Sequence, residues 1–380
     1  MKNRDLLPCI GHSLFKGKVI VLYGTRRVGK TTLVKHIMGQ YKDRSTRYFN
    51  CEDWITRQQL ETTNTEELYK VLGKYDLVVM DEAQFIEPIG WILKIINDAY
   101  PEIQIIATGS SSFDLANKTG EPLVGRSRVF TLYPFSLNEL GYDLIKLNSN
   151  IENILRFGLY PTVIEKTEEE SKEELANITS GYLYKDILAI EGIKHSKVLM
   201  ELLVALSLQM GNEISYNELS NKLGISVNTV IRYIDLLEKC FVIFVLPAFS
   251  RNLRNEVGIK SKKIYFYDLG IRNAIINNFA PLALRTDVGA LWENFCIMEL
   301  IKKRRNSRLF TNHYFWRTYD KQEIDFIEEY NGKIYGYELK YNRKAKIPKI
   351  FTKTYDAPVK IINKSNYFDV FLDPKPEGSC

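Results

Sequence analysis

The sequence predicts an α/β protein of several parts, and three observations carry this prediction. A glycine-bounded loop follows an apolar strand near the N-terminus, two capped helices joined by a glycine turn lie in the middle, and a hairpin dense in acids lies near the C-terminus. With 380 residues the chain is too long for one ordinary core. We therefore expect two or three domains.

Composition points to a folded protein in the cytoplasm. Hydrophobic residues make up 45% of the chain and charged residues 26%, the balance of a globular protein. The longest apolar run, residues 240–249, is about half of what a bilayer requires, so no membrane partner is expected. The N-terminus lacks an apolar signal core. Five scattered cysteines without a CxxC pattern and four scattered histidines predict reduced thiols and no structural zinc.

The net charge of +6 is unevenly distributed. From residue 251 onward there are 24 Lys and Arg against 15 Asp and Glu, with basic runs at 302–308 and 340–349. Such a surface attracts polyanions, which makes nucleic acid a predicted partner. A solvated helix end would carry the same charges, so the runs alone do not decide.

The first motif is a phosphate-binding loop. In "KVIVLYGTRRVGKTTLVKHI" an apolar strand precedes a complete GxxxxGK[ST] pattern, and an amphipathic helix follows it. The glycines let backbone N–H groups face inward, Lys30 reaches the β- and γ-phosphates, and the Thr31 hydroxyl can ligate Mg²⁺. The predicted nucleotide-binding residues are Gly24, Thr25, Arg26, Arg27, Val28, Gly29, Lys30, Thr31 and Thr32.

A pair of acids supplies the second half of this site. "DLVVMDEAQ" places Asp81 and Glu82 at the end of an apolar strand, the edge where parallel sheets hold their ligands. Asp81 is predicted on the Mg²⁺ side, and Glu82 is predicted to polarise the attacking water. Alone, such a strand end could be a simple cap; about fifty residues after a phosphate-binding loop it indicates a nucleotide hydrolase.

Two further segments complete the predicted nucleotide site. A strand at 102–112 ends in small polar residues, of which we choose Ser110 as the sensor of the γ-phosphate or the water, with Thr108 as its rival. Arg126 and Arg128 precede the next strand, and one of them is predicted to act as an arginine finger, in cis or from a neighbouring subunit. We take Arg126 as the candidate.

These motifs, in this order, resemble the AAA-type P-loop ATPases. The resemblance implies ATP as the ligand. A GTPase is disfavoured because the strand end reads DEAQ and because "NKTG" at 117–120 lacks the aspartate that binds guanine.

The middle of the chain predicts a helix-turn-helix arrangement followed by a strand. In "ISYNELSNKLGISVNTVIRYIDLLEKCFVIFVL", Ser215 caps the first helix, Gly224 makes the turn and Ser226 caps the second helix. In a DNA-binding version the second helix would face the major groove with Asn228, Thr229, Arg232 and Tyr233. A protein-binding role remains equally open.

The last motif is a hairpin, "KQEIDFIEEYNGKIYGYELK", with a type I′ turn at Asn331 and Gly332. This turn places Asp325 opposite Glu338, and Glu323 opposite Lys340 in an ordinary ion pair. Facing carboxylates repel unless a cation lies between them. Mg²⁺ would fill that role, and Lys340 could then stabilise an attacked phosphate. A solvated outer strand is the alternative.

The pattern D325-(12)-E338-x-K340, after a helix that carries Glu293, resembles the core of the PD-(D/E)XK nuclease-like fold. The resemblance implies that Glu293, Asp325, Glu338 and Lys340 form a nuclease site in which Asp325 and Glu338 bind Mg²⁺. No proline precedes Asp325, but that position varies in the family.

Residues 10–372 as a whole resemble a bacterial and archaeal group that joins an AAA-type ATPase to a winged helix and a restriction-endonuclease-like domain of uncharacterised role. The segments "LVGR", "LYPFS", "FGLYPTV" and "KIYFYDLGIRNA" carry this resemblance. It implies four domains: residues 1–145 (ATPase), 146–205 (helical connector), 206–250 (winged helix-turn-helix) and 251–380 (nuclease-like). An ATP-driven switch that binds DNA or a protein without nuclease activity is the rival function. The sequence leaves oligomerisation open.

Overall fold

The computed structural model describes residues 2–110, 123–183, 196–251, 261–342 and 345–372. The chain divides into two compact units, residues 1–133 and residues 134–379, and each is considered by itself. No described helix combines the length and the apolar character needed to cross a membrane. Cys51, Cys240 and Cys296 are buried free thiols, but Cys9 is disulfide-bonded, so the expectation of reduced thiols is wrong for that residue.

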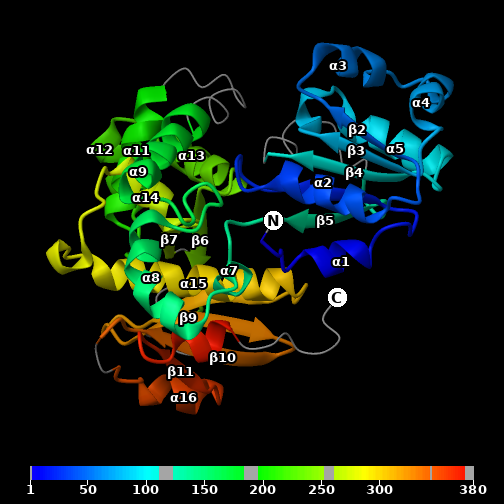
Figure 1. The fold of residues 1–380 in the computed structure, drawn as a ribbon. Coiled ribbons are helices and arrows are strands. Elements are labelled where there is room, and N and C mark those ends of the chain that lie inside the picture. Colours follow the sequence, from blue (N-terminus) through cyan, green and yellow to red (C-terminus); the bar gives the residue numbers. More distant parts are fainter. Residues whose placement is uncertain (1, 111–122, 184–195, 252–260, 343–344, 373–380) are drawn as a thin grey trace. The chain divides into compact units, whose positions relative to one another are not determined.

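The first unit is built on a five-stranded parallel sheet (Figure 1). Strand order across the sheet is β2-β3-β4-β1-β5. Every residue of β1 and β3 is buried, as expected for apolar strands covered on both faces. The strands are β1 (Val19–Tyr23), β2 (Thr46–Asn50), β3 (Leu77–Asp81), β4 (Gln104–Gly109) and β5 (Ser127–Thr131).

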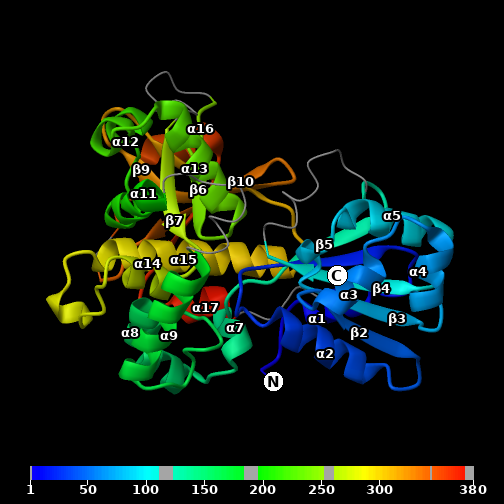
Figure 2. The ribbon, with the colours of Figure 1, turned by 90° about the horizontal axis from the view of Figure 1, so that it is seen from above.

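Helices cover both faces of this sheet, with α1 and α2 on one face and α5 on the other (Figures 1 and 2). Side chains from α1 and α2 form one core cluster with those of β1, β3 and β5. Because β4 lies between β1 and β3, the residues that follow these three strands meet at one edge of the sheet. The helices are α1 (Leu7–Gly11), α2 (Lys30–Gln40), α3 (Trp54–Leu60), α4 (Thr65–Leu72), the 3₁₀ turn η1 (Ala83–Phe85) and α5 (Ile89–Ala99).

The second unit begins with helices. The described helices up to residue 275 are α7 (Leu137–Leu140), α8 (Leu144–Phe157), α9 (Glu168–Ile178), the π-helix η2 (Thr179–Leu183), α11 (Ser196–Leu208), α12 (Tyr216–Leu223), α13 (Val227–Lys239) and α14 (Leu269–Ile275). After α13, β6 (Ile243–Pro247) pairs antiparallel with β7 (Lys262–Phe266). Most of the segment that joins these two strands lies outside the described residues.

The predicted turn and caps of the middle segment agree with the structure, but one predicted surface residue does not. Ser215 and Ser226 cap α12 and α13 through their side chains, and Gly224 ends α12 in the left-handed conformation. On α13, Asn228 and Arg232 are exposed. Tyr233 is only 2% exposed, because it falls on the apolar stripe of the helix, so the prediction that it faces a groove is wrong.

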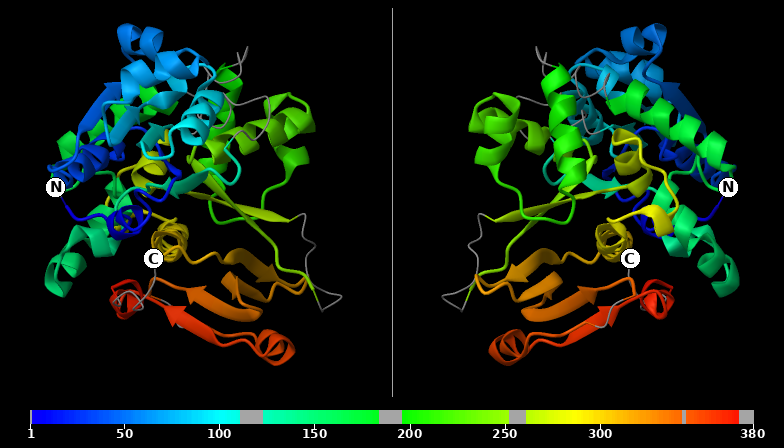
Figure 3. Two further views of the ribbon diagram at one scale, coloured as in Figure 1. Left: turned by 90° about the vertical axis from the view of Figure 1, so that its right-hand side faces the viewer. Right: turned by 90° about the vertical axis from the view of Figure 1, so that its left-hand side faces the viewer.

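A four-stranded sheet of order β11-β10-β9-β8 forms the C-terminal part, and the long helix α15 lies over one of its faces (Figure 3). The indole N–H of Trp292 in α15 donates to the carbonyl of Ile362 in β11 at 3.3 Å, which fixes the helix on the sheet. The elements are η3 (Leu282–Leu284), α15 (Val288–Asn306), β8 (Asn312–Arg317), β9 (Glu323–Tyr330), β10 (Lys333–Leu339), α16 (Lys349–Tyr355), β11 (Val359–Ile362) and α17 (Tyr367–Phe371).

The β9–β10 hairpin has the predicted turn and register. Asn331 and Gly332 both have positive φ, 49° and 75°, as a type I′ turn requires. The register runs as predicted as far as Phe326 opposite Tyr337. The backbone pairing ends at these two residues. Asp325 and Glu338 were predicted to be the next pair, and that prediction is wrong.

Candidate functional sites

The loop between β1 and α2 curls over the end of the sheet. Gly24 has φ +153°, and a Cβ there would collide with the carbonyl oxygen of Leu132. Gly29 has φ +100° and is the N-cap residue of α2. Both positions therefore need glycine, and the loop leads directly into the N-terminus of α2, where backbone N–H groups and the helix dipole favour phosphate.

Lys30 lies inside this loop. Its ammonium group donates to the carbonyl oxygens of Gly24 at 2.8 Å and Thr25 at 3.2 Å. It also lies 3.6 Å from the carboxylate of Glu82. Burial lowers the pKa of Lys30, and Glu82 and Asp81 oppose that shift. The loop and the acidic strand end are thus joined through a single cation.

Asp81 is the centre of a cluster of hydroxyl groups. Its Oδ2 accepts from Thr31 at 2.6 Å and from Tyr48 at 2.6 Å, and its Oδ1 accepts from Thr108 at 2.5 Å. The structure brings together the two predicted Mg²⁺ ligands, Thr31 and Asp81. Tyr48 was missed by sequence reasoning because its contact depends on β2 lying beside β3, which no local pattern reveals.

Glu82 follows in the left-handed conformation, with φ 54°. Its backbone N–H donates to the Thr108 hydroxyl at 3.0 Å, and its carboxylate accepts from the Gln84 amide at 2.6 Å. Thr108 therefore touches both acids. Ser110, our first choice as sensor, lies one residue beyond the end of β4. It is 2% exposed and Thr108 is 0% exposed, so burial does not separate the two candidates and the choice of Ser110 stays a prediction.

The predicted arginine fingers lie elsewhere in the first unit. The backbone carbonyl of Arg126 accepts from Val19 at the start of β1, and its guanidinium binds Asp98 at 2.5 Å. Arg128 donates to Ser13 at 2.9 Å. In a parallel sheet the start of β1 is the edge opposite the loop, so Arg126 cannot act on a nucleotide bound in the same chain. Action in a neighbouring subunit stays a prediction.

A second cluster lies in the second unit, where β9 and β10 part. Asp325 accepts from the backbone N–H of Leu339 at 2.7 Å and from the Lys340 ammonium at 2.6 Å. The same ammonium lies 3.0 Å from Glu338. Asp325 and Glu338 are 3% and 4% exposed, which excludes the solvated-strand alternative. Burial, followed by the nearby charge of Asp325, raises the pKa of Glu338 to about 8.

Glu293 of α15 joins this cluster through residues of β7. Its Oε1 accepts from the Tyr265 hydroxyl at 2.5 Å and lies 3.2 Å from the buried ammonium of Lys263. Lys263 also binds Glu323 at 2.5 Å. The predicted ion pair of Glu323 with Lys340 is therefore wrong, because each residue has found a different partner. Sequence reasoning missed both Lys263 and Tyr265.

All four predicted nuclease-like residues line one cavity of about 1540 Å³: Glu293, Asp325, Glu338 and Lys340. Within the described residues, no group of three or more His, Cys, Asp or Glu side chains is arranged to hold a metal ion. Mg²⁺ needs only one or two carboxylates, with water as its other ligands. Asp325 and Glu338 meet that lower requirement.

Three family models match three successive regions of the chain. Residues 16–141 match a model described as an AAA domain. Residues 148–282 and 288–367 match two models described as domains of unknown function, DUF8612 and DUF4143. The nucleotide-site acids and the loop lie in the first region, and the cluster around Asp325 lies in the third.

Relatives over most of the chain are uncharacterized proteins of bacteria and archaea. One from Mycobacterium tuberculosis is 26% identical over 90% of this chain and 74% of its own length. One from Methanocaldococcus jannaschii is 27% identical over 86% of this chain and 74% of its own length. The Pif1 helicase of Candida albicans aligns with 12% identity over 47% of this chain and 48% of that one, but its TM-score of 0.26 is too low to support an argument.

The AAA match agrees with the parallel sheet, the curled loop and the convergence of Lys30, Thr31 and Asp81. The N-terminal part of the chain therefore resembles the AAA-type P-loop domains in sequence and in fold, which supports nucleotide binding. A separate sheet domain lies in the C-terminal part of the chain.

Proposed function

We propose that this protein binds and hydrolyses ATP with Mg²⁺, and that its second unit cleaves a phosphodiester in nucleic acid under the control of the ATPase. Residues 206–250, together with β7, would serve as a winged helix that contacts DNA through Asn228, Thr229 and Arg232. The ATPase and the cleavage site are each supported by a different set of contacts.

ATP hydrolysis rests on one observation above all: the 2.6 Å hydrogen bond between Thr31 of α2 and Asp81 of β3. A hydroxyl and a carboxylate so placed beside Lys30 are the ligands that Mg²⁺ uses in P-loop enzymes. Glu82 directly follows Asp81 and would orient the attacking water. Thr108 holds both acids in place through its hydroxyl.

Phosphodiester cleavage is supported by the shared cavity of Glu293, Asp325, Glu338 and Lys340. Asp325 and Glu338 would hold Mg²⁺, since both are buried carboxylates within 3.0 Å of the same ammonium. When bound, the metal supplies Lewis-acid activation of the phosphate and of a water molecule. Lys340 would then turn from its carboxylate partners toward the charge that develops on the phosphate.

The rival function is an ATP-driven switch that binds nucleic acid or a protein without cutting. One observation favours it: the acids already have cations of their own. Lys263 pairs with Glu293 and Glu323, and Lys340 pairs with Asp325 and Glu338. Four carboxylates that already share two lysine partners depend less on a metal to relieve their repulsion.

ATPase and nuclease assays on the same preparations separate these functions. Lys30→Ala should abolish ATP binding, and Glu82→Gln should bind ATP without turnover. Asp325→Ala should keep the ATPase activity and lose cleavage of single-stranded, double-stranded or structured DNA or RNA in Mg²⁺. Full ATPase activity in Lys30→Ala or Glu82→Gln overturns the first proposal. No cleavage by the wild-type protein, with or without ATP, overturns the second and leaves the switch.

A further inference from the structure

The large cavity of the second unit is also lined by a second group of charged residues, separate from the acid cluster. Besides Asp325 and Glu338 it is lined by Arg272 of α14, by Arg285 and Asp287, and by Gly289 and Ala290 in the first turn of α15. This wall contains two buried arginines and the N-terminus of a 19-residue helix. None of these residues belongs to the nuclease-like motif.

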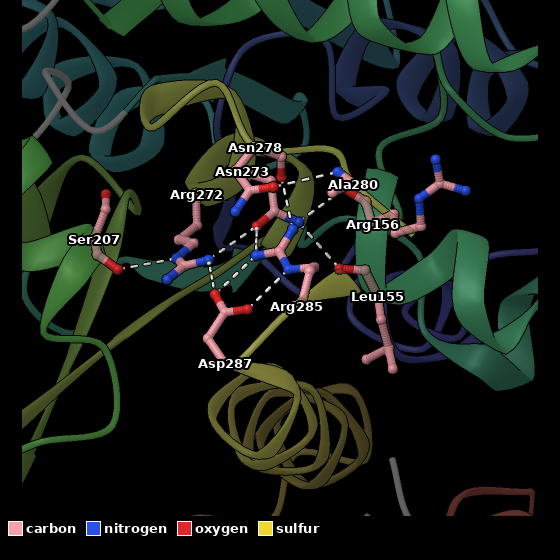
Figure 4. A network of polar contacts seen from close by, with 9 residues as sticks. All are labelled: Leu155, Arg156, Ser207, Arg272, Asn273, Asn278, Ala280, Arg285 and Asp287. Atoms are coloured by element: carbon pink, nitrogen blue, oxygen red, sulfur yellow. Dashed lines mark hydrogen bonds and ion pairs between the residues drawn. The ribbon is translucent and has the colours of Figure 1, made fainter. Parts of the chain in front are cut away.

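Arg285 is fixed on all sides by hydrogen bonds (Figure 4). Its Nε and Nη2 donate to both carboxylate oxygens of Asp287 at 2.8 Å. Its Nη1 donates to the carbonyl of Asn278 at 2.6 Å, and Nη2 also donates to the amide oxygen of Asn273 at 3.0 Å. All three guanidinium nitrogens of Arg285 are thus used to hold Asn273, Asn278 and Asp287 in place.

Arg272 is held in place by hydrogen bonds from two of its three guanidinium nitrogens. Its Nε donates to the carbonyl of Ser207 at 2.9 Å, and its Nη1 donates to Asn273 at 3.1 Å and to Asp287 at 2.6 Å. Its Nη2 has no partner within the described residues, and Figure 4 shows one Arg272 nitrogen without a dashed line. The residue is 3% exposed, and Nη2 is not among the fully buried unsatisfied atoms of the described chain. This amino group therefore reaches the cavity.

Charge is not balanced within the network of Arg272, Arg285 and Asp287. Two guanidinium groups share the single carboxylate of Asp287, whose pKa is lowered to about 2 despite burial because both arginines donate to it. The network thus carries a net charge of +1. Glu152 also lines the cavity, and its carboxylate accepts from the backbone N–H of Leu282 at 3.1 Å.

The first turn of α15 adds to the positive potential. Asp287 is its N-cap residue but makes no side-chain cap hydrogen bond, because both of its oxygens are taken by arginines. The first N–H groups of a helix otherwise lack partners and carry the positive end of the helix dipole. Gly289 and Ala290, whose N–H groups belong to this turn, lie on the cavity wall.

We propose that Arg272 Nη2 and the first turn of α15 form a phosphate-binding subsite, which holds a phosphate of a nucleic-acid strand while a different phosphate of that strand lies at Asp325 and Glu338. This inference rests on the proposed nucleic-acid function for the source of the phosphate. The chemistry of the subsite requires only a phosphate oxygen, so a free phosphate or a nucleotide would bind in the same way.

Binding without metal tests the subsite alone. The full chain carries Lys30→Ala to remove the phosphate site of the ATPase domain, and EDTA keeps the acid cluster free of cations. Fluorescence anisotropy then follows labelled single-stranded DNA and RNA. Arg272→Gln should weaken binding about tenfold, and the salt dependence of log K should fall by about one unit. Arg272→Lys should weaken it less.

Arg156→Gln is the matched control, because Arg156 pairs with Glu168 at 2.7 Å on the same unit, lies outside both basic runs and does not line the cavity. It removes one charge and one partly buried ion pair, so a general loss of stability or charge would affect both variants. Thermal melting of both confirms that they are folded. Equal binding by Arg272→Gln and its parent, or equal weakening by Arg156→Gln, overturns the subsite.

Calorimetry with inorganic phosphate separates the subsite from the proposed function. If the parent binds no oligonucleotide but binds phosphate, and Arg272→Gln loses the phosphate, the subsite stands and the nucleic-acid function fails. If the parent binds oligonucleotide and Arg272→Gln binds it equally well, the nucleic-acid function stands and the subsite fails. A parent that binds neither ligand overturns both.

Discussion

The buried carboxylate of Glu338 makes the stability of the second unit depend on pH. The pKa of Glu338 is raised from its ordinary value of 4.5 to about 8, first by burial and then by the charge of Asp325. Between these two values the unfolded chain has released the proton and the folded chain retains it. The free energy of unfolding therefore falls as pH rises from about 5 to 8.

The size of this loss follows from the two pKa values. Each pH unit between them costs the folded state up to about 1.4 kcal/mol, which sums to an upper limit of about 5 kcal/mol. Lys340 lies 3.0 Å from Glu338 and favours its ionised form, and water in the cavity screens the charges. We therefore expect about 2 kcal/mol between pH 5 and pH 8.

Glu338→Gln removes this dependence while it keeps the shape of the side chain. The free energy of unfolding of the variant, minus that of the wild type, should therefore rise by about 2 kcal/mol from pH 5 to pH 8. Urea unfolding in EDTA, followed by tryptophan fluorescence, measures this change. Trp292 and Trp316 are 0% exposed and report on the second unit, whereas Trp54 and Trp91 are 61% and 41% exposed and should change little.

Glu329→Gln on the neighbouring strand β9 is the matched control. Arg251 donates to Glu329 and lowers its pKa, so this carboxylate titrates below the tested range and its removal should shift stability equally at both pH values. A difference between Glu338→Gln and the wild type that stays constant within about 0.5 kcal/mol would refute the reasoning. Saturating Mn²⁺ should flatten the wild-type dependence, because a bound cation favours the ionised carboxylate.

Other contacts give further predictions. Thr108→Val should lower ATP turnover about 100-fold, because both acids lose a hydrogen-bond partner, and Ser110→Ala should lower it less; equal losses in steady-state assays would contradict this ranking. Tyr48→Phe should lower the Kd for Mg²⁺-ATP by a few fold, since Asp81 loses a competing donor, and an unchanged Kd in titrations of nucleotide fluorescence would exclude that role. Lys263→Met should destabilise the second unit by about 3 kcal/mol, because Glu293 would be left buried without its cation, and Lys263→Arg should restore most of the loss in urea unfolding.

Local sequence patterns were sufficient for the parts of the fold that local chemistry decides. Asn331 and Gly332 specified the type I′ turn, and the turn specified the register of the strands beside it. The phosphate-binding loop was predictable because Gly24 and Gly29 adopt backbone conformations that other residues rarely reach. The pairing failed where the hairpin ends, because Asp325 there binds a backbone N–H with its side chain.

What sequence reasoning missed depends on neighbours distant in the chain. Tyr48 reaches Asp81 because β2 pairs with β3 in parallel, a register that no pattern within β2 encodes. Arg126 was predicted as a finger from its place before the next strand, yet the direction of the sheet puts it at the edge opposite the phosphate-binding loop. Tyr233 was predicted on the exposed side of the second helix, but it lies three residues after Val230 and four before Leu237, on the face of α13 that packs inward.

Lys263 and Tyr265 show most clearly how the second unit is put together. They are two residues apart on β7, so they point to the same side of that strand, and both contact Glu293 of α15. β7 also pairs with β6, which directly follows α13. The partners of Glu293 are therefore carried by the same hairpin that would form the wing. Any movement of this hairpin must change the contacts of Glu293, which gives the helix-turn-helix segment a direct physical connection to the acid cluster.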